Sequence, residues 1–129
     1  MMLRRFSRRY VLGLALATLA PLAANAAGYP DKPIQLIVPF PAGGSLDGVV
    51  RTMQPKLSAY LGQTLVIENV GGAGGAIGAS RVARAAPDGY TLLVGTNNDV
   101  ALAPTLNDAI QYSPRDFTPI ALAASTPVR

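Results

Sequence analysis

The chain has 129 residues, of which 50% are hydrophobic, and it carries a formal net charge of +4. This length suffices for one domain or for part of a larger protein. Because the sequence contains neither cysteine nor histidine, it can form no disulfide, thiol nucleophile, Ser–His hydrolase centre or His/Cys metal site.

The first 26 residues have the composition of an export signal. Four arginines precede an apolar run over residues 11–22, and small residues at 24–26 suit cleavage after about Ala26. The segment around Arg8 and Arg9 also resembles a twin-arginine signal. The apolar run is short for a spanning helix and contains Pro21, so a retained membrane anchor is the weaker interpretation. We therefore expect a periplasmic protein whose mature part comprises residues 27–129.

Removing this signal changes the charge of the chain. Seven basic and seven acidic residues remain, so the mature protein is close to neutral. A neutral surface without a basic patch does not predict nucleic acid or an anionic membrane as a partner.

Residues 34–47 predict a strand, a glycine loop and the start of a helix. An apolar run over 34–38 breaks at Pro39 and continues through Gly43 and Gly44 to Asp47. Such a loop lets a ligand approach the backbone, and the N–H groups of the following helix suit an anion such as a carboxylate. The alternative is a tight connection in which Ser45 is the N-cap.

Further elements follow at short intervals. Apolar spacing predicts a helix over 46–61, closed by Gly62 and kinked or broken at Pro55. We expect strands at 64–69 and 90–95, a helix over 77–86 after the glycines at 71–75, and a fourth strand beginning at 120–124.

This order of elements predicts an α/β fold with a parallel sheet and flanking helices. In such a sheet the three loops that follow the strands converge at one edge, where ligands bind. The third of these loops contains Thr96, Asn97, Asn98 and Asp99. We therefore predict a small-molecule site there, with no cofactor, because neither glycine cluster matches a nucleotide-binding motif.

Two carboxylates, Asp47 and Asp99, are expected at this shared edge. A pair of aspartates there suits acid–base chemistry or contact with an ammonium group. Asp47 is also favourable in the first turn of a helix without any ligand. We expect Asp88 to serve a turn, and Asp108 and Asp116 to occupy solvated or capping positions.

Six motifs, taken together and in order, resemble one family. They are YPDKPI at 29–34, VPFPAGG with Asp47, LGQ at 61–63, EN at 68–69 with the following glycines and Ile77-Gly78, PDGYTL at 87–92 and DFTPI at 116–120. The chain thereby resembles the Bug, or tripartite tricarboxylate transporter substrate-binding (TctC-like), family of periplasmic receptors.

This resemblance implies the first lobe of a periplasmic-binding-protein-like (type II) bilobal receptor that delivers a small carboxylated solute to membrane permease subunits. It implies ligand contacts in the first glycine loop at Phe40, Ala42, Gly44 and Asp47, and in the second at Gly74 and Gly75. We add Gly43, Ser45 and residues 96–99 from the predicted convergence of the loops. Asp99 favours an amino-acid-like solute over a polycarboxylate.

Receptors of this family are considerably longer, so we expect residues 27–129 to be mainly the N-terminal portion of one. A fragment, a truncated gene product and a short form remain open. We expect binding and not catalysis. The alternatives are a non-binding remnant or structural fragment and, with less support, an enzyme that uses the paired aspartates.

Overall fold

The computed structural model describes residues 28–125, so the predicted export signal lies outside the described residues. The strands are β1 (Ile34–Val38), β2 (Leu65–Asn69) and β3 (Thr91–Leu93), and the helices are α1 (Ser45–Leu61), α2 (Ala76–Ala83) and α3 (Ala103–Leu106). Shorter turns are η1 (Ala73–Gly75), η2 (Asn98–Leu102) and η3 (Pro114–Asp116). No helix within residues 28–125 is long and apolar enough to cross a membrane.

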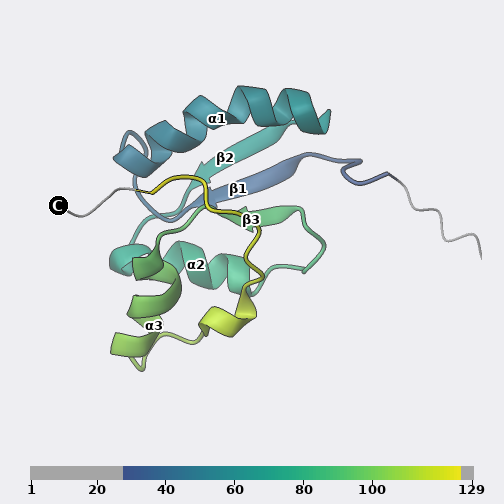
Figure 1. The fold of residues 1–129 in the computed structure, drawn as a ribbon. Coiled ribbons are helices and arrows are strands. Elements are labelled where there is room, and N and C mark those ends of the chain that lie inside the picture. The colour runs from purple at the N-terminus through teal and green to yellow at the C-terminus, as the bar shows by residue number, and fades with distance from the viewer. Residues whose placement is uncertain (1–27, 126–129) are drawn as a thin grey trace, which may run out of the picture.

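The three strands form one parallel sheet in the order β2-β1-β3. Ile34 pairs with Leu65 and Val38 with Asn69, while Gln35 pairs with Thr91 on the other side of β1. Helix α1 covers one face of the sheet and α2 the other (Figure 1). The predicted α/β fold with a parallel sheet and flanking helices is confirmed.

The core lies on both faces of β1. Ile34, Leu36 and Val38 alternate toward Val50 of α1, because successive side chains of a strand point to opposite faces. On the side of α2, Ala76 and Ala79 pack with Tyr112. This central strand, buried on both faces, fixes where the loop after Val38 emerges.

Helix α1 ends at the predicted residue, but its N-cap and its course at Pro55 differ from the sequence-based expectation. Gly62 adopts φ 67°, the left-handed conformation of a helix C-terminus. The N-cap is Gly44 and not Ser45. A kink or a break was predicted at Pro55, and the break is wrong: the helix is continuous, and Val50 before the proline and Leu61 after it both pack against the sheet.

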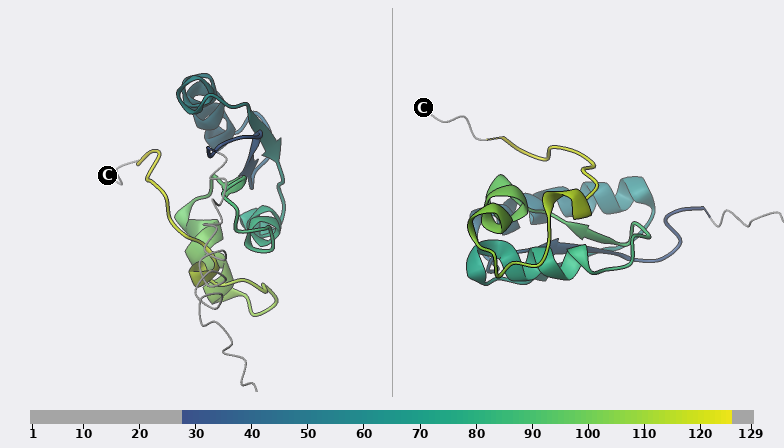
Figure 2. Two further views of the ribbon diagram at one scale, coloured as in Figure 1. Left: turned by 90° about the vertical axis from the view of Figure 1, so that its right-hand side faces the viewer. Right: turned by 90° about the horizontal axis from the view of Figure 1, so that it is seen from below.

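The predicted fourth strand at 120–124 is also wrong. These residues pair with no strand of the described part, and Ile120 and Leu122 are 77% and 84% exposed. The segment stands clear of the sheet in both views of Figure 2. β2 and β3 each pair only with β1 and keep one free side, but residues 120–124 do not lie alongside either of them, so their apolar composition alone does not make them a strand.

Two aspartates take the local roles predicted for them. Asp88 accepts a hydrogen bond from the backbone of Tyr90 at 3.0 Å, closing a turn. Asp116 accepts one from the backbone of Ser113 at 2.8 Å and completes a capping box.

Candidate functional site

The loops after the three strands meet at one edge of the sheet. In the first loop, Phe40 lies against Gly75 of the second, since a Cβ built on Gly75 would be 3.4 Å from the ring. Thr96, from the third loop, lines a pocket together with first-loop residues. Loops distant in sequence thereby form one surface.

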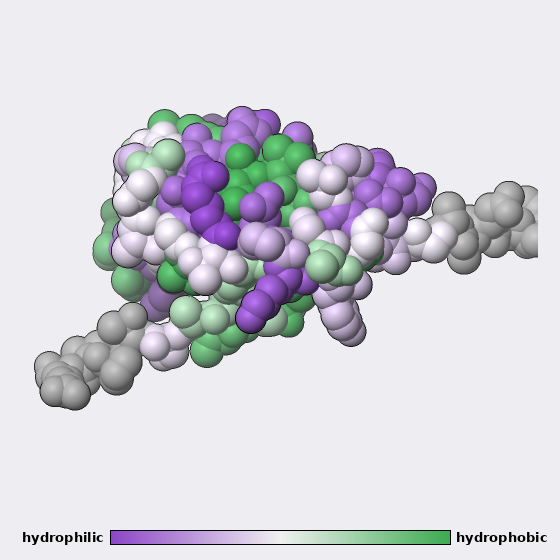
Figure 3. All heavy atoms as spheres, turned by 90° about the horizontal axis from the view of Figure 1, so that it is seen from above, coloured by the Kyte–Doolittle hydropathy of each residue, from purple (hydrophilic) through white to green (hydrophobic). Residues whose placement is uncertain are grey.

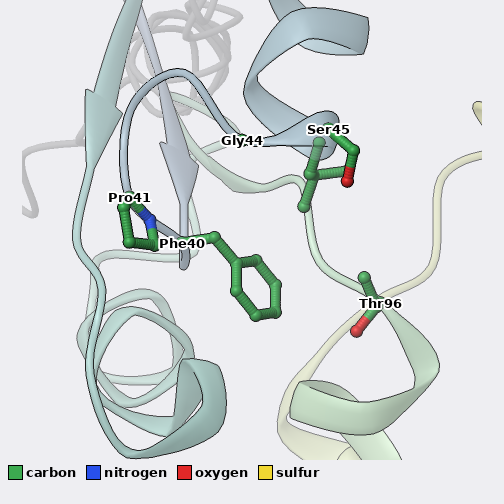
Figure 4. A pocket seen from close by; sticks show the side chains of 6 residues that line it. Phe40, Pro41, Gly44, Ser45 and Thr96 are labelled. Carbon is green, nitrogen blue, oxygen red and sulfur yellow. The ribbon is translucent and has the colours of Figure 1, made fainter.

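This surface contains a pocket of about 260 Å³ (Figure 4). Its lining residues are Phe40, Pro41, Gly44, Ser45, Leu46 and Thr96. Four of the predicted ligand-binding residues therefore line it: Phe40, Gly44, Ser45 and Thr96. The other predicted residues, Ala42, Gly43, Asp47, Gly74, Gly75, Asn97, Asn98 and Asp99, do not.

The start of α1 supplies hydrogen-bond donors to this pocket. Gly43 and Gly44 direct their N–H groups to Asp47 Oδ2 and Pro41 O, and Gly48 bonds to Gly44 O at 3.0 Å. Three N–H groups lie between them, at Ser45, Leu46 and Asp47, in the first turn, where a helix offers no carbonyl partner. Of these three residues, Ser45 and Leu46 line the pocket. No basic side chain of residues 28–125 lines the pocket, so the backbone dipoles of this part of the chain are the groups that can attract an anion there.

Asp47 is directed into the first loop and away from the pocket. It is 2% exposed, and Oδ2 accepts from Gly43 N–H and Arg51 Nε, each at 2.8 Å. Oδ1 accepts from Asn69 Nδ2 at 3.0 Å. Hydrogen bonds from Arg51, then Gly43, then Asn69 lower the pKa of Asp47 to about 2. In this structure the Asp47 carboxylate is buried and holds the first loop, and the ammonium contact predicted for it stays a prediction.

Asn69 and Arg51 complete this network, and sequence analysis did not identify them as site residues. Asn69 Nδ2 also donates to Phe40 O at 3.1 Å, and Arg51 Nη2 donates to Asn69 Oδ1 at 3.2 Å. Both were open to inference, since Arg51 lies one helical turn after Asp47 and Asn69 ends the strand beside β1. Their hydrogen bonds fix the course of the backbone around the pocket.

The second loop uses its glycines for close packing. Gly75 has φ 99°, and a Cβ built on it would lie 2.6 Å from Asp99 Cβ. Gly74 also has positive φ, 65°. Gly75 is buried behind the pocket, while Gly74 is exposed.

Asp99 lies behind the third loop. It lies in the first turn of η2 and is fully buried, with Oδ1 accepting from the Thr96 hydroxyl and from Thr96 N–H at 2.7 Å. The Tyr112 hydroxyl donates to the Asp99 carbonyl. Since neither Asp47 nor Asp99 lines the pocket, the geometry does not support an acid–base pair. Within residues 28–125, no cluster of three His, Cys, Asp or Glu side chains is arranged to hold a metal ion.

Comparison with known proteins shows similarity to one family throughout. Residues 49–129 match the family described as "Tripartite tricarboxylate transporter family receptor". BugT of Bordetella pertussis is 40% identical over 123 residues, covering 92% of this chain and 37% of BugT. A UPF0065 protein from the ttuE-ttuC' intergenic region of Agrobacterium vitis is 40% identical over 129 residues, covering 96% of this chain and 36% of that protein.

Two solved structures share this fold and carry dicarboxylates. MatC of Rhodopseudomonas palustris with bound malate superposes with a TM-score of 0.69 and 44% identity, over 74% of this chain and 33% of MatC. Another R. palustris protein, solved with adipate, gives a TM-score of 0.63 and 37% identity over 67% of this chain and 29% of its own. The present chain thus spans little more than a third of the length of the relatives that it matches.

Proposed function

Because the chain belongs to the tripartite tricarboxylate transporter receptor family, we propose that it forms a solute-binding lobe for a small carboxylated solute. The observation that carries this proposal is the pocket at the start of α1, which combines first-turn N–H donors with a wall of apolar side chains. Binding, and not catalysis, is the function that these groups support.

One carboxylate of the solute lies over the first turn of α1. The N–H groups of Ser45 and Leu46 and the Ser45 hydroxyl are the donors for its oxygens. The Phe40 ring extends toward Ser45 and Thr96 and covers the carbon skeleton of the solute (Figure 4). The malate and adipate held by the two R. palustris proteins support a dicarboxylate as the solute class.

The network behind the first loop prepares this site before a solute arrives. Asp47 and Arg51 neutralise each other, so the loop adds no net charge near the solute. Hydrogen bonds to Gly43 N–H and Phe40 O hold the backbone on both sides of the turn. A site ordered in advance loses less conformational freedom on binding.

As part of this proposal, residues 1–26 direct the protein to the periplasm, and the loaded receptor delivers its solute to membrane permease subunits. The family supports both steps. Saturable solute binding would distinguish the receptor from a protein that binds no solute.

Gly44→Val tests the site by titration calorimetry with malate and adipate. Gly44 lines the pocket and has φ −73°, which any residue can adopt, and a Cβ there would meet one atom, Pro41 O at 3.3 Å, so a small shift of the loop accommodates it. The added side chain should therefore block binding while the helix persists. Gly48→Ala is the matched control, because a Cβ there meets nothing within 4 Å. Unchanged affinity in Gly44→Val would contradict the proposed site.

A further inference from the structure

Asp99 carries a buried carboxylate with no compensating cation. Its side chain is fully buried, and Oδ2 accepts no hydrogen bond within the described residues. No ion pair of residues 28–125 includes it; the pairs present are Lys32–Asp88, Arg51–Asp47 and Arg81–Glu68. A buried charge left unpaired is costly, so its retention requires an explanation.

The backbone around Asp99 leaves room for the carboxylate and for little else. A Cβ built on Gly95 would lie 2.5 Å from Asp99 Oδ2, and one built on Gly75 would lie 2.6 Å from Asp99 Cβ. Glycine at these two positions therefore admits the aspartate to the space between the second and third loops. Burial, and then the neighbouring Asp99 carboxylate, raise the pKa of Tyr112.

The carboxylate also lies immediately behind the pocket wall. Thr96, which lines the pocket, gives both its N–H and its hydroxyl to Asp99 Oδ1. The Phe40 ring, also a lining residue, is in contact range of Gly75, which packs on Asp99. Within residues 28–125 no basic side chain lines the pocket to offset this carboxylate. Protein surroundings weaken an electric field less than water does, so a charge on Asp99 acts on a bound solute.

We propose that Asp99 determines specificity from behind Thr96: it biases the pocket toward solutes that carry an ammonium group beside their carboxylates, and against the same carboxylates without one. This inference rests on the proposed function, a carboxylate site at the start of α1. Asp99 touches no solute, and its effect is electrostatic.

The test compares L-aspartate with succinate, which has the same two carboxylates without the ammonium group. Titration calorimetry of the unaltered protein should give tighter binding of L-aspartate. In Asp99→Asn the amide oxygen can still accept both Thr96 hydrogen bonds while the charge is lost. The ratio of the two dissociation constants should then move toward succinate by about tenfold, the scale of one screened charge–charge interaction.

Asp88→Asn is the control, because it also removes one negative charge but lies in the turn before β3 and does not line the pocket. It should leave the preference for L-aspartate in place. Equal or tighter binding of succinate by the unaltered protein would overturn the inference, as would an unchanged ratio in Asp99→Asn. If the unaltered protein bound neither compound, the proposed function itself would fail.

Discussion

Gly78→Ala tests how the second glycine segment supports the first loop. Gly78 is buried in α2, where a Cβ would lie 2.7 Å from Val70 O, 2.8 Å from Pro39 Cβ and 2.9 Å from Pro39 Cα. Two of these three atoms belong to the backbone, and the proline ring is rigid, so the contact cannot be relieved by a change of rotamer. The helix must instead move away from the start of the first loop.

The expected change in stability is the sum of two opposing effects. Overpacking costs about 1–3 kcal/mol, and three contacts below 3 Å place this position toward the upper end. Alanine favours a helix over glycine by about 1 kcal/mol. We therefore expect Gly78→Ala to reduce the free energy of unfolding by about 2 kcal/mol.

Gly48→Ala is again the matched control, since it is a helical glycine with open space around the new Cβ. It should gain about 0.5–1 kcal/mol from helix propensity alone. Urea unfolding followed by circular dichroism should place the two midpoints about 1 M apart or more, for a slope of about 2 kcal/mol per M. Equal midpoints would refute the packing of α2 against Pro39.

Three further predictions concern Asp47 and the glycine loops. Asp47→Asn should weaken the affinity for succinate and for L-aspartate by the same factor in calorimetry, because the carboxylate holds Gly43 N–H and Arg51 and not the solute. A loss of affinity for L-aspartate alone would instead indicate a direct contact between Asp47 and the ammonium group. The pKa of Asp47 falls from its ordinary 3.8 to about 2 on folding. The stability that the ionised carboxylate contributes is therefore present above about pH 4 and is lost as pH falls through about 2. Thermal unfolding in acid should show this loss of stability, and the loss should be smaller in Asp47→Asn. Gly75→Ala should lower the urea midpoint more than Gly43→Ala, since both positions have positive φ but only Gly75 would clash with Asp99.

The parallel sheet could be predicted because β1, β2 and β3 are short apolar runs bounded by glycine and proline, and because strand–helix alternation restricts the topology. The meeting of the loops followed from that topology. The helix end at Gly62 followed from the freedom of glycine to adopt positive φ. These features depend on local composition and chain order, which a sequence records.

The roles of Asp47 and Asp99 could not be predicted in the same way. Sequence spacing brings both residues to one edge of the sheet, but tertiary partners decide where each side chain points. Asp47 turns toward Asn69, which is 22 residues away. Asp99 accepts hydrogen bonds from Thr96 in its own loop, but its burial depends on Gly75, which is distant in the sequence. The same limit explains the error at 120–124, where strand formation depends on a neighbour that composition does not reveal.

An amide NMR titration of the purified chain with succinate tests the central claim most directly. The account predicts saturable shifts that are largest at the backbone N–H groups of Ser45 and Leu46 and extend to Thr96, because these residues line one pocket. Gly62, at the far end of α1, should not shift. Saturable shifts centred away from the start of α1, or no shift at any succinate concentration, would contradict a carboxylate site in this lobe.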